Sequence, residues 1–288
     1  MLGLVVTAVQ PVHGGMINES AILHTNIGTI FGKWRSRAAP GFFAAEAHGL
    51  EILRRADAFR TPAVIAFRDS EQGAEPAFLL LEAIRPHERQ TARPAEVGER
   101  LARLHRFTAS DFGLERDNFI GLMPQQNGRM VAWAGFYAQR RLAPQIALAR
   151  QSRALTPDLE RDVIRVTEAL PELLADVDEP PSLLHGDLWS GNLLTGESGE
   201  PVLVDPAVSY SHRELELAYM QLFPGFEPEL FAAYEAAWPL SPGYRRRRAV
   251  YQIYPLLNHL NHFGAQYLAP LQAACRLAVA PLSLAPEA

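Results

Sequence analysis

Lysine and cysteine are nearly absent from this sequence of 288 residues, which contains one of each. The single cysteine, Cys275, excludes a disulfide within the chain. The N-terminus has no basic segment followed by an apolar core and a cleavage site, so it does not resemble a secretory signal. Together these absences predict a protein of the reducing cytoplasm.

Long apolar runs are also lacking, and no stretch approaches the ~20 residues that cross a bilayer. The net charge of −5 gives no overall attraction to nucleic acid or to an anionic membrane surface. The hydrophobic share of 48% is sufficient for a globular core. We therefore expect a folded protein with neither nucleic acid nor membrane as a partner. None of these features specifies the oligomeric state.

The most informative stretch runs from Leu184 to Asn192 and reads LHGDLWSGN. Asp187 precedes Asn192 by five positions, and Asp205 follows Asn192 by thirteen, after the apolar run 202–204. A turn with two glycines at 196–199 separates two strand-like runs, which predicts a hairpin that brings Asn192 and Asp205 together. Each of these residues alone would also suit an ordinary turn.

An Asp, an Asn and a second Asp in this order and spacing are typical of a kinase active site. We therefore predict that Asp187 is the catalytic base, which accepts the proton of the attacking hydroxyl. Asn192 and Asp205 are predicted ligands of Mg²⁺, because this ion prefers hard oxygen donors and is held beside nucleotide phosphates. The predicted cofactors are accordingly ATP and Mg²⁺.

The only lysine, Lys33, lies in the strand-like segment Thr29–Trp34, whereas the other 26 of the 27 basic residues are arginines. A compact ammonium in an apolar strand suits a point contact with nucleotide phosphates. Glu46 lies in the first turns of a helix predicted over 42–58. We predict that Glu46 pairs with Lys33, as a helix glutamate does in kinases, although an acid near a helix N-terminus is also favourable by itself.

Five strand-like segments precede residue 85 and predict an antiparallel sheet, at Val5–Val12, Ser20–Thr25, Thr29–Trp34, Pro62–Phe67 and Ala77–Leu81. The first turn contains Gly14 and Gly15, whose backbone can approach phosphates closely, although a plain hairpin turn explains them as well. After the fifth strand, Glu82, Ala83 and Ile84 are predicted to form a connector whose backbone hydrogen-bonds an adenine edge.

We accordingly predict a nucleotide-binding lobe at 1–84 and a helical lobe at 85–288 that carries the catalytic loop and the substrate site. The four arginines at 245–248 are predicted to form a solvated face. The spacing of apolar residues beyond Pro94 predicts helices at Val97–Arg106, Val131–Leu142, Pro144–Ala149, Pro157–Leu174, Arg213–Leu222, Pro228–Ala237 and Arg245–Leu268.

Two acidic residues, Glu214 and Glu216, follow Asp205 by nine and eleven positions. Either could steer the substrate or the metal, and either could brace the catalytic loop by accepting backbone N–H groups. We predict the bracing role for Glu216. His185, at the start of the catalytic loop, is a further candidate for support of the site.

Taken together, these motifs resemble the fructosamine kinase family, also called ketosamine-3-kinases, within the protein-kinase-like fold of aminoglycoside and choline kinases. The resemblance covers nearly the whole chain. Its most specific element is Leu184–Asn192, in which Leu-Trp-Ser-Gly stands between Asp187 and Asn192. Asp205–Ala207 replaces the Asp-Phe-Gly of protein kinases. Further matches are Glu214–Ala218, Leu222–Phe223, Gly225–Phe226 and Asn258–Gly264.

The resemblance implies a bilobal α+β fold with a five-stranded antiparallel N-lobe and a mainly helical C-lobe, and it gives the predicted site residues the same roles. The family phosphorylates the sugar 3-hydroxyl of ketoamines formed by glycation, after which the adduct becomes unstable and releases the amine. This implies deglycation repair on small-molecule or protein-bound ketoamines. The sequence does not distinguish fructosyl, ribulosyl and erythrulosyl sugars. The alternatives are an aminoglycoside or choline-like hydroxyl kinase and a nucleotide-binding module without turnover.

Overall fold

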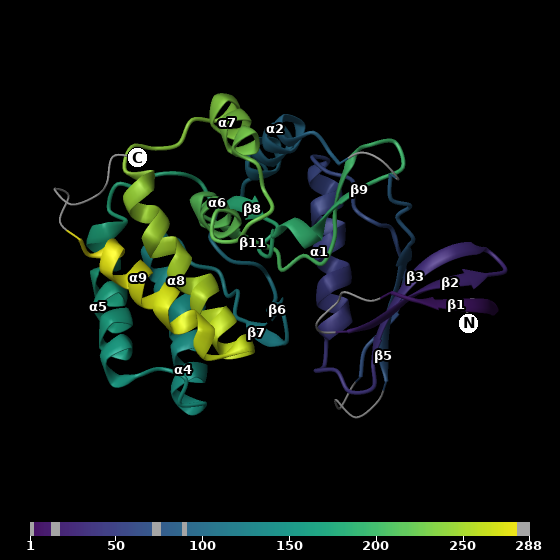
Figure 1. Cartoon of the computed structure of the whole chain (residues 1–288), viewed down its shortest axis with the longest axis horizontal. Coiled ribbons are helices and arrows are strands. Elements are labelled where there is room, and N and C mark those ends of the chain that lie inside the picture. The colour runs from purple at the N-terminus through teal and green to yellow at the C-terminus, as the bar shows by residue number, and fades with distance from the viewer. Residues whose placement is uncertain (1–2, 13–17, 71–75, 88–90, 281–288) are drawn as a thin grey trace.

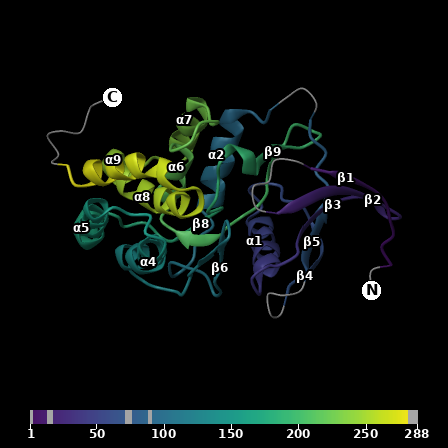
Figure 2. The ribbon, with the colours of Figure 1, turned by 60° about the horizontal axis from the view of Figure 1, so that its bottom comes forward.

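Helix α1 (Phe42–Ala56) stands between a β-sheet and a mainly helical part (Figure 1). The structure is a computed structural model and describes residues 3–12, 18–70, 76–87 and 91–280. When the molecule is turned by 60°, the sheet and the helical part still lie on opposite sides of α1 (Figure 2). The molecule is therefore bilobal, as the sequence predicts.

The sheet has the strand order β1-β2-β3-β5-β4, and every neighbouring pair is antiparallel. This confirms the predicted five-stranded antiparallel sheet. The strands are β1 (Val6–Pro11), β2 (Glu19–Thr25), β3 (Gly28–Arg35), β4 (Val64–Arg68) and β5 (Ala77–Glu82).

Residues of a strand alternate between the two faces of a sheet, and one face of this sheet packs against α1. In β5, Ala77, Leu79 and Leu81 are buried and form a cluster with Phe43 of α1. Lys33 of β3 pairs directly with Leu79, and directly paired residues project from the same face of a sheet. The strand register therefore directs Lys33 toward α1.

The N-terminus of α1 is capped from a distant part of the chain. Gly41, the residue before the helix, has φ +77 and offers no side chain for a cap. The carboxylate of Asp69 instead accepts hydrogen bonds from the backbone N–H groups of Phe43 and Ala44, both at 2.9 Å. A negative group at this position also favours the helix dipole. Asp69 thus fastens α1 to the segment that follows β4.

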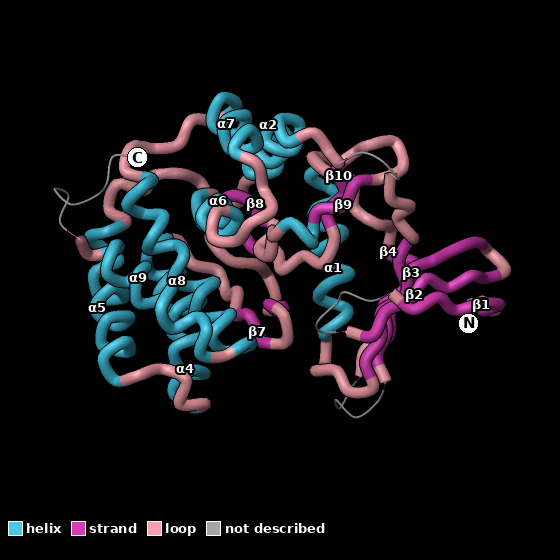
Figure 3. Tube along the Cα trace, in the orientation of Figure 1, coloured by secondary structure: helices cyan, strands magenta, loops and turns pink. Residues whose placement is uncertain are grey.

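Side chains of α5, α8 and α9 contribute to a large core in the helical part. Figure 3 shows these three helices side by side. The aromatic side chains of Phe136 and Tyr137 in this core are fully buried. The α-helices beyond α1 are α2 (Pro94–His105), α3 (Trp133–Phe136), α4 (Ala143–Gln151), α5 (Pro157–Leu173), α6 (Glu214–Met220), α7 (Pro228–Ala237), α8 (Tyr244–Phe263) and α9 (Leu268–Ala278). A π-helical turn, Tyr137–Leu142, joins α3 to α4.

The end of the chain differs from the sequence prediction of one helix over Arg245–Leu268. Helix α8 ends at Phe263, because Gly264 adopts φ +88 and breaks the helical path. A 3-10 turn at Ala265–Tyr267 follows, and α9 then packs back against α8 and α5. The predicted helix therefore ends at Gly264, and the following residues form a separate helix, α9.

Within the described residues of the helical part there are three two-stranded sheets, of which only one was predicted. The predicted hairpin after Asn192 is confirmed as β9 (Leu193–Thr195) paired with β10 (Pro201–Leu203). The other pairs are β6 (Asn118–Ile120) with β7 (Met123–Gln125), and β8 (Ser182–Leu184) with β11 (Ser209–Ser211). Strands of three residues carry too little periodicity to be recognised in a sequence, unless a glycine turn marks the hairpin as it does between β9 and β10.

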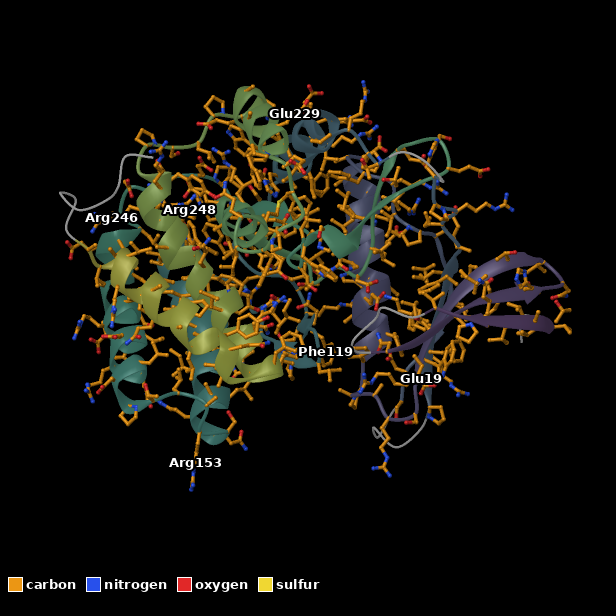
Figure 4. All side chains as sticks on the ribbon, viewed as in Figure 1. Glu19, Phe119, Arg153, Glu229, Arg246 and Arg248 are labelled. Carbon is orange, nitrogen blue, oxygen red and sulfur yellow. The ribbon has the colours of Figure 1, made fainter. Side chains whose placement is uncertain are left out.

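The two lobes touch through α1. The ring of Phe42 lies 5.0 Å from that of Phe119 on β6, and Phe119 is labelled near the junction in Figure 4. His48 of α1 also contacts Glu115 of the helical part at 2.6 Å.

No helix in the described part of the chain is long and apolar enough to cross a membrane.

The prediction of a solvated arginine face at 245–248 is wrong for Arg247, which is 2% exposed. Its guanidinium donates to both oxygens of Glu214, at 2.6 and 2.7 Å, and to Asp176 at 3.0 Å. Figure 4 labels its neighbours Arg246 and Arg248 on α8. A run of equal charges spans every face of a helix, so one member can point into the core when a carboxylate is there to receive it.

Replacement of Glu214 by Gln should strongly destabilise the fold, because it leaves the buried Arg247 charge without its bidentate partner. We expect the free energy of unfolding to fall by about 3 kcal/mol in urea titrations. The control is Asp158→Asn, which removes the exposed i,i+3 pair with Arg161 and should cost under about 1 kcal/mol. Equal losses in both variants would contradict the assignment of Arg247 to the core.

Candidate active site

The loop that carries Asp187 is packed directly against the loop that carries Asp205. The backbone N–H of Ala207 donates to the carbonyl of His185 at 2.9 Å, next to the pairing of β8 with β11. Gly186 has φ +85, and a Cβ atom built there would lie 2.1 Å from the carbonyl oxygen of Ala207. Only glycine satisfies both the backbone angle and the close approach.

Asp187 is half-buried and is held by two side chains. The hydroxyl of Tyr219 donates to its Oδ1 at 2.7 Å. The Nδ2 of Asn192 donates to the carbonyl oxygen of Asp187 at 2.8 Å and lies 3.4 Å from its Oδ2. Burial raises the pKa of Asp187 to about 7, although the Tyr219 hydrogen bond opposes this shift. A carboxylate with such a pKa can accept a proton near neutral pH.

Asn192 and Asp205 are drawn together by the β9–β10 hairpin. The backbone N–H of Val204 donates to the carbonyl oxygen of Asn192 at 3.1 Å. Asp205 has φ +57, a left-handed conformation that is uncommon for a residue other than glycine. Strained backbone of this kind is found at functional sites. The hairpin therefore places the two residues as the sequence indicates.

The donor set at Asn192 and Asp205 fits a magnesium ion. The amide nitrogen of Asn192 faces Asp187, which leaves its amide oxygen for another partner. Asp205 contributes a carboxylate, so both candidate ligands are the hard oxygen donors that magnesium requires.

Lys33 joins the sheet to this loop. It is 5% exposed, and its Nζ lies 2.8 Å from Oε1 of Glu46 and also forms an ion pair with Asp205. Burial lowers the pKa of Lys33, but the two carboxylates more than offset that effect, so its pKa is raised overall. Lys33 is therefore a cation held between α1 and the loop of Asp205.

Glu216 of α6 anchors the start of the catalytic loop. One of its oxygens accepts the backbone N–H of His185 at 3.0 Å, and the other accepts that of Gly186 at 2.6 Å. His105 of α2 contacts the carboxylate through Nε2 at 3.1 Å. Burial raises the pKa of Glu216, but its interactions with His105, His185 and the Gly186 N–H together outweigh that effect, so the pKa is lowered overall. Glu216 is 2% exposed and holds a negative charge entirely within the protein.

The other two predicted supporting residues have different positions. His185 is fully buried, and its Nε2 donates to the carbonyl oxygen of Val204 at 2.8 Å, while its Nδ1 accepts the N–H of Asp187 at 3.3 Å. His185 therefore connects the loop of Asp187 with the loop of Asp205. Glu214 is bonded to Arg247 on the far side of α6 and makes no hydrogen bond to the catalytic loop among the described residues.

The predicted nucleotide connector begins at Glu82, whose side chain is already engaged. Its carboxylate pairs with Arg60 and accepts the backbone N–H of Ala63 at 3.2 Å. Ala83 and Ile84 are half-buried and follow the end of β5. The predicted phosphate-contacting glycines, Gly14 and Gly15, lie outside the described residues.

A cavity beside Asp187 was not predicted from the sequence. Its lining includes Tyr219 of α6 and polar side chains from β7, the π-helical turn and α8, namely Gln125, Arg141, Asn258 and His259. These residues come from segments far apart in the chain, so no local spacing connects them. The cavity adjoins the Asp187 carboxylate.

A family model described as fructosamine kinase matches residues 3–279. The chain belongs to the fructosamine kinase family. Among the relatives of this fructosamine kinase family member, a probable ketoamine kinase from Enterococcus faecium is 38% identical over 260 residues, which are 90% of this chain and 91% of that protein. A chloroplastic protein-ribulosamine 3-kinase from Arabidopsis thaliana is 34% identical over 264 residues, or 91% of this chain and 79% of that protein.

Solved structures show which fold this chain shares with known proteins. The crystal structure of a candidate fructosamine-3-kinase from Thermobifida fusca matches with a TM-score of 0.86 at 33% identity, over 97% of this chain and 96% of that one. Aminoglycoside phosphotransferase APH(4)-Ia matches with a TM-score of 0.63 at 17% identity, over 96% and 94%. The predicted family and the protein-kinase-like fold are confirmed. The family also confirms the prediction of a phosphotransferase that acts on an alcohol group.

Replacement of Gly186 by Ala should displace the catalytic loop, because the added Cβ would collide with the carbonyl oxygen of Ala207. We expect phosphotransfer activity to fall by at least about 100-fold, since small displacements of catalytic groups have effects of this size. The control is Gly28→Ala, which also places a side chain at positive φ but meets nothing within 4 Å. Activity of the Gly186 variant that matches the Gly28 control would contradict this interpretation.

Proposed function

We propose that this chain is an ATP-dependent kinase that phosphorylates the sugar 3-hydroxyl of ketoamines. The observation that carries the proposal is the meeting of Asp187, Asn192, Asp205 and Lys33 at one site in a member of the fructosamine kinase family. Phosphoryl transfer needs such a group of residues, since its catalysis consists mainly of positioning and charge neutralisation.

In the proposed reaction, Asp187 accepts the proton of the substrate hydroxyl while the hydroxyl oxygen forms a bond to the terminal phosphorus of ATP. The bond between that phosphorus and the bridging oxygen breaks, and ADP leaves with the electron pair. Lys33 holds the nucleotide phosphates, and Glu46 keeps Lys33 in place. Asn192 and Asp205 would hold Mg²⁺, which supplies charge neutralisation at the phosphates.

The nucleotide is proposed to lie between an N-lobe of residues 1–84 and a C-lobe of residues 85–288. In this arrangement Gly14 and Gly15 contribute backbone contacts to the phosphates. Backbone groups at Glu82, Ala83 and Ile84 contact the adenine edge. The half-buried position of Ala83 and Ile84 at the end of β5 is compatible with such contacts.

The proposed substrates are small-molecule or protein-bound ketoamines, and the proposed role is deglycation repair in the cytoplasm. Relatives named ketoamine kinase and protein-ribulosamine 3-kinase support this substrate class. Polar side chains in the cavity beside Asp187 would suit the hydroxyl groups of a sugar. Phosphorylation at the 3-hydroxyl would make the adduct unstable and so release the amine.

The base assignment is tested by Asp187→Asn, because an amide cannot accept the proton of the hydroxyl. We expect transfer from radiolabelled ATP to a ketoamine to fall by roughly 10²- to 10⁴-fold, with ATP affinity in calorimetry largely unchanged. Asp178→Asn, at an exposed position, is the matched control and should retain full activity. Near-normal turnover by the Asp187 variant would disprove the base assignment.

The substrate class is tested by offering ketoamines of three sugar lengths, an aminoglycoside and choline side by side with the same ATP. We expect the ketoamines to be phosphorylated fastest, and the position of the phosphate on the sugar can be found by NMR. Faster turnover of the aminoglycoside or of choline would replace the ketoamine assignment. Tight ATP binding without transfer to any acceptor would instead indicate a nucleotide-binding module.

A further inference from the structure

Tyr219 makes the only side-chain hydrogen bond shorter than 3 Å to the Asp187 carboxylate among the described residues. Its hydroxyl donates to Oδ1 at 2.7 Å, and its side chain and Asp187 line the same cavity. The tyrosine is 8% exposed, so this hydrogen bond is largely shielded from water. A hydrogen bond to a carboxylate in such surroundings is stronger than one at the surface.

The ring of Tyr219 is itself held in place by packing. It meets the ring of Phe223 edge-on, with centroids 5.6 Å apart, and lies 6.3 Å from the ring of His259. Because these contacts fix the ring, its hydroxyl reaches Asp187 from one direction. The hydroxyl therefore restrains the rotation of the carboxylate about its side-chain bonds.

This restraint makes the two carboxylate oxygens of Asp187 unequal. Oδ1 is occupied by the Tyr219 hydroxyl at 2.7 Å. From the part of the chain that the structure describes, Oδ2 receives only the 3.4 Å contact with Nδ2 of Asn192, which is long for a hydrogen bond. Oδ2 is thus the oxygen with capacity left for a substrate hydroxyl.

Helix α6 then holds the catalytic loop in two ways. Glu216 binds the backbone of His185 and Gly186, and Tyr219, three residues later, binds the side chain of Asp187. Residues three apart lie on the same face of a helix, so both contacts come from one face of α6. Helix α6 itself packs on α8.

We propose that Tyr219 is a positioning residue that holds Oδ1 of Asp187, so that Oδ2 takes the proton of the substrate hydroxyl. The inference rests on the proposed function, in which Asp187 is the base. In the step itself, the O–H bond of the substrate breaks and its proton passes to Oδ2. The freed oxygen bonds to the terminal phosphorus of ATP, and ADP departs with the electrons of the broken P–O bond. Tyr219 keeps its own proton throughout.

The test is Tyr219→Phe, which retains the ring packing and removes only the hydroxyl. We expect kcat for the best ketoamine to fall about 10- to 100-fold, the range that one hydrogen bond to a charged group provides. The KM values for ATP and ketoamine should stay within about twofold, because the lost contact orients the base and does not bind either substrate.

The matched control is Tyr244→Phe, since the Tyr244 hydroxyl also donates to a side chain, Oε1 of Gln221 at 2.9 Å, just beyond the end of α6. Urea unfolding of both variants measures the stability that each hydroxyl contributes. We expect similar stabilities but a loss of kcat only for the Tyr219 variant. A merely structural role for Tyr219 would instead lower stability and leave kcat close to that of the wild type.

The outcomes separate this inference from the proposed function. If the wild type phosphorylates ketoamines and Tyr219→Phe keeps its kcat within about twofold, the positioning role is wrong while the function stands. If another hydroxyl acceptor is the true substrate, the same comparison of kcat on that acceptor decides the role of Tyr219. A wild type that transfers phosphate to no acceptor would overturn both.

Discussion

The ion pairs of Lys33 connect the two lobes at the centre of this protein. Its ammonium is buried between Glu46 on α1 and Asp205 on the loop after β10. A buried charge is costly unless it is paired, so the sheet, the helix and the loop must meet for this lysine to be accommodated. The strand register directs Lys33 toward α1, and the cap from Asp69 fastens that helix to the sheet. The contacts that pair this buried lysine therefore also bring the residues of the site together.

The catalytic loop has a second support that is independent of the lysine. Helix α6 presents a buried carboxylate to the backbone of the loop, and Gly186 allows the loop to lie against Ala207 without collision. Backbone N–H groups that face the protein interior need an acceptor, and Glu216 supplies one for two of them. The loop is thus held by hydrogen bonds and close packing within the protein, an arrangement that favours preorganised catalysis.

Much of this arrangement follows from patterns along the chain. The sheet, α1 and the β9–β10 hairpin are local structures, and alternation or helical spacing identifies them. The pairing of Lys33 with Glu46 could be predicted because kinases pair a strand lysine with a glutamate of the next helix. The position of Arg247 could not, since its burial depends on Glu214 being present on a neighbouring helix. The three-residue strands β8 and β11 likewise form only because each supplies the partner of the other from a separate part of the chain.

By itself, the sequence determined the family, the order of the elements and the set of groups suited to phosphoryl transfer, because these depend on residue type and short-range spacing. Tertiary structure decided how those groups are held. Glu216 acts with His105 from α2, and Asp187 is bonded to Tyr219, a residue with no motif to single it out. The cavity beside Asp187 combines side chains from β7, the π-helical turn and α8. The contacts of Glu216 with His105 and of Asp187 with Tyr219 join residues 111 and 32 positions apart, so packing of the whole core, and not local preference, fixes their geometry.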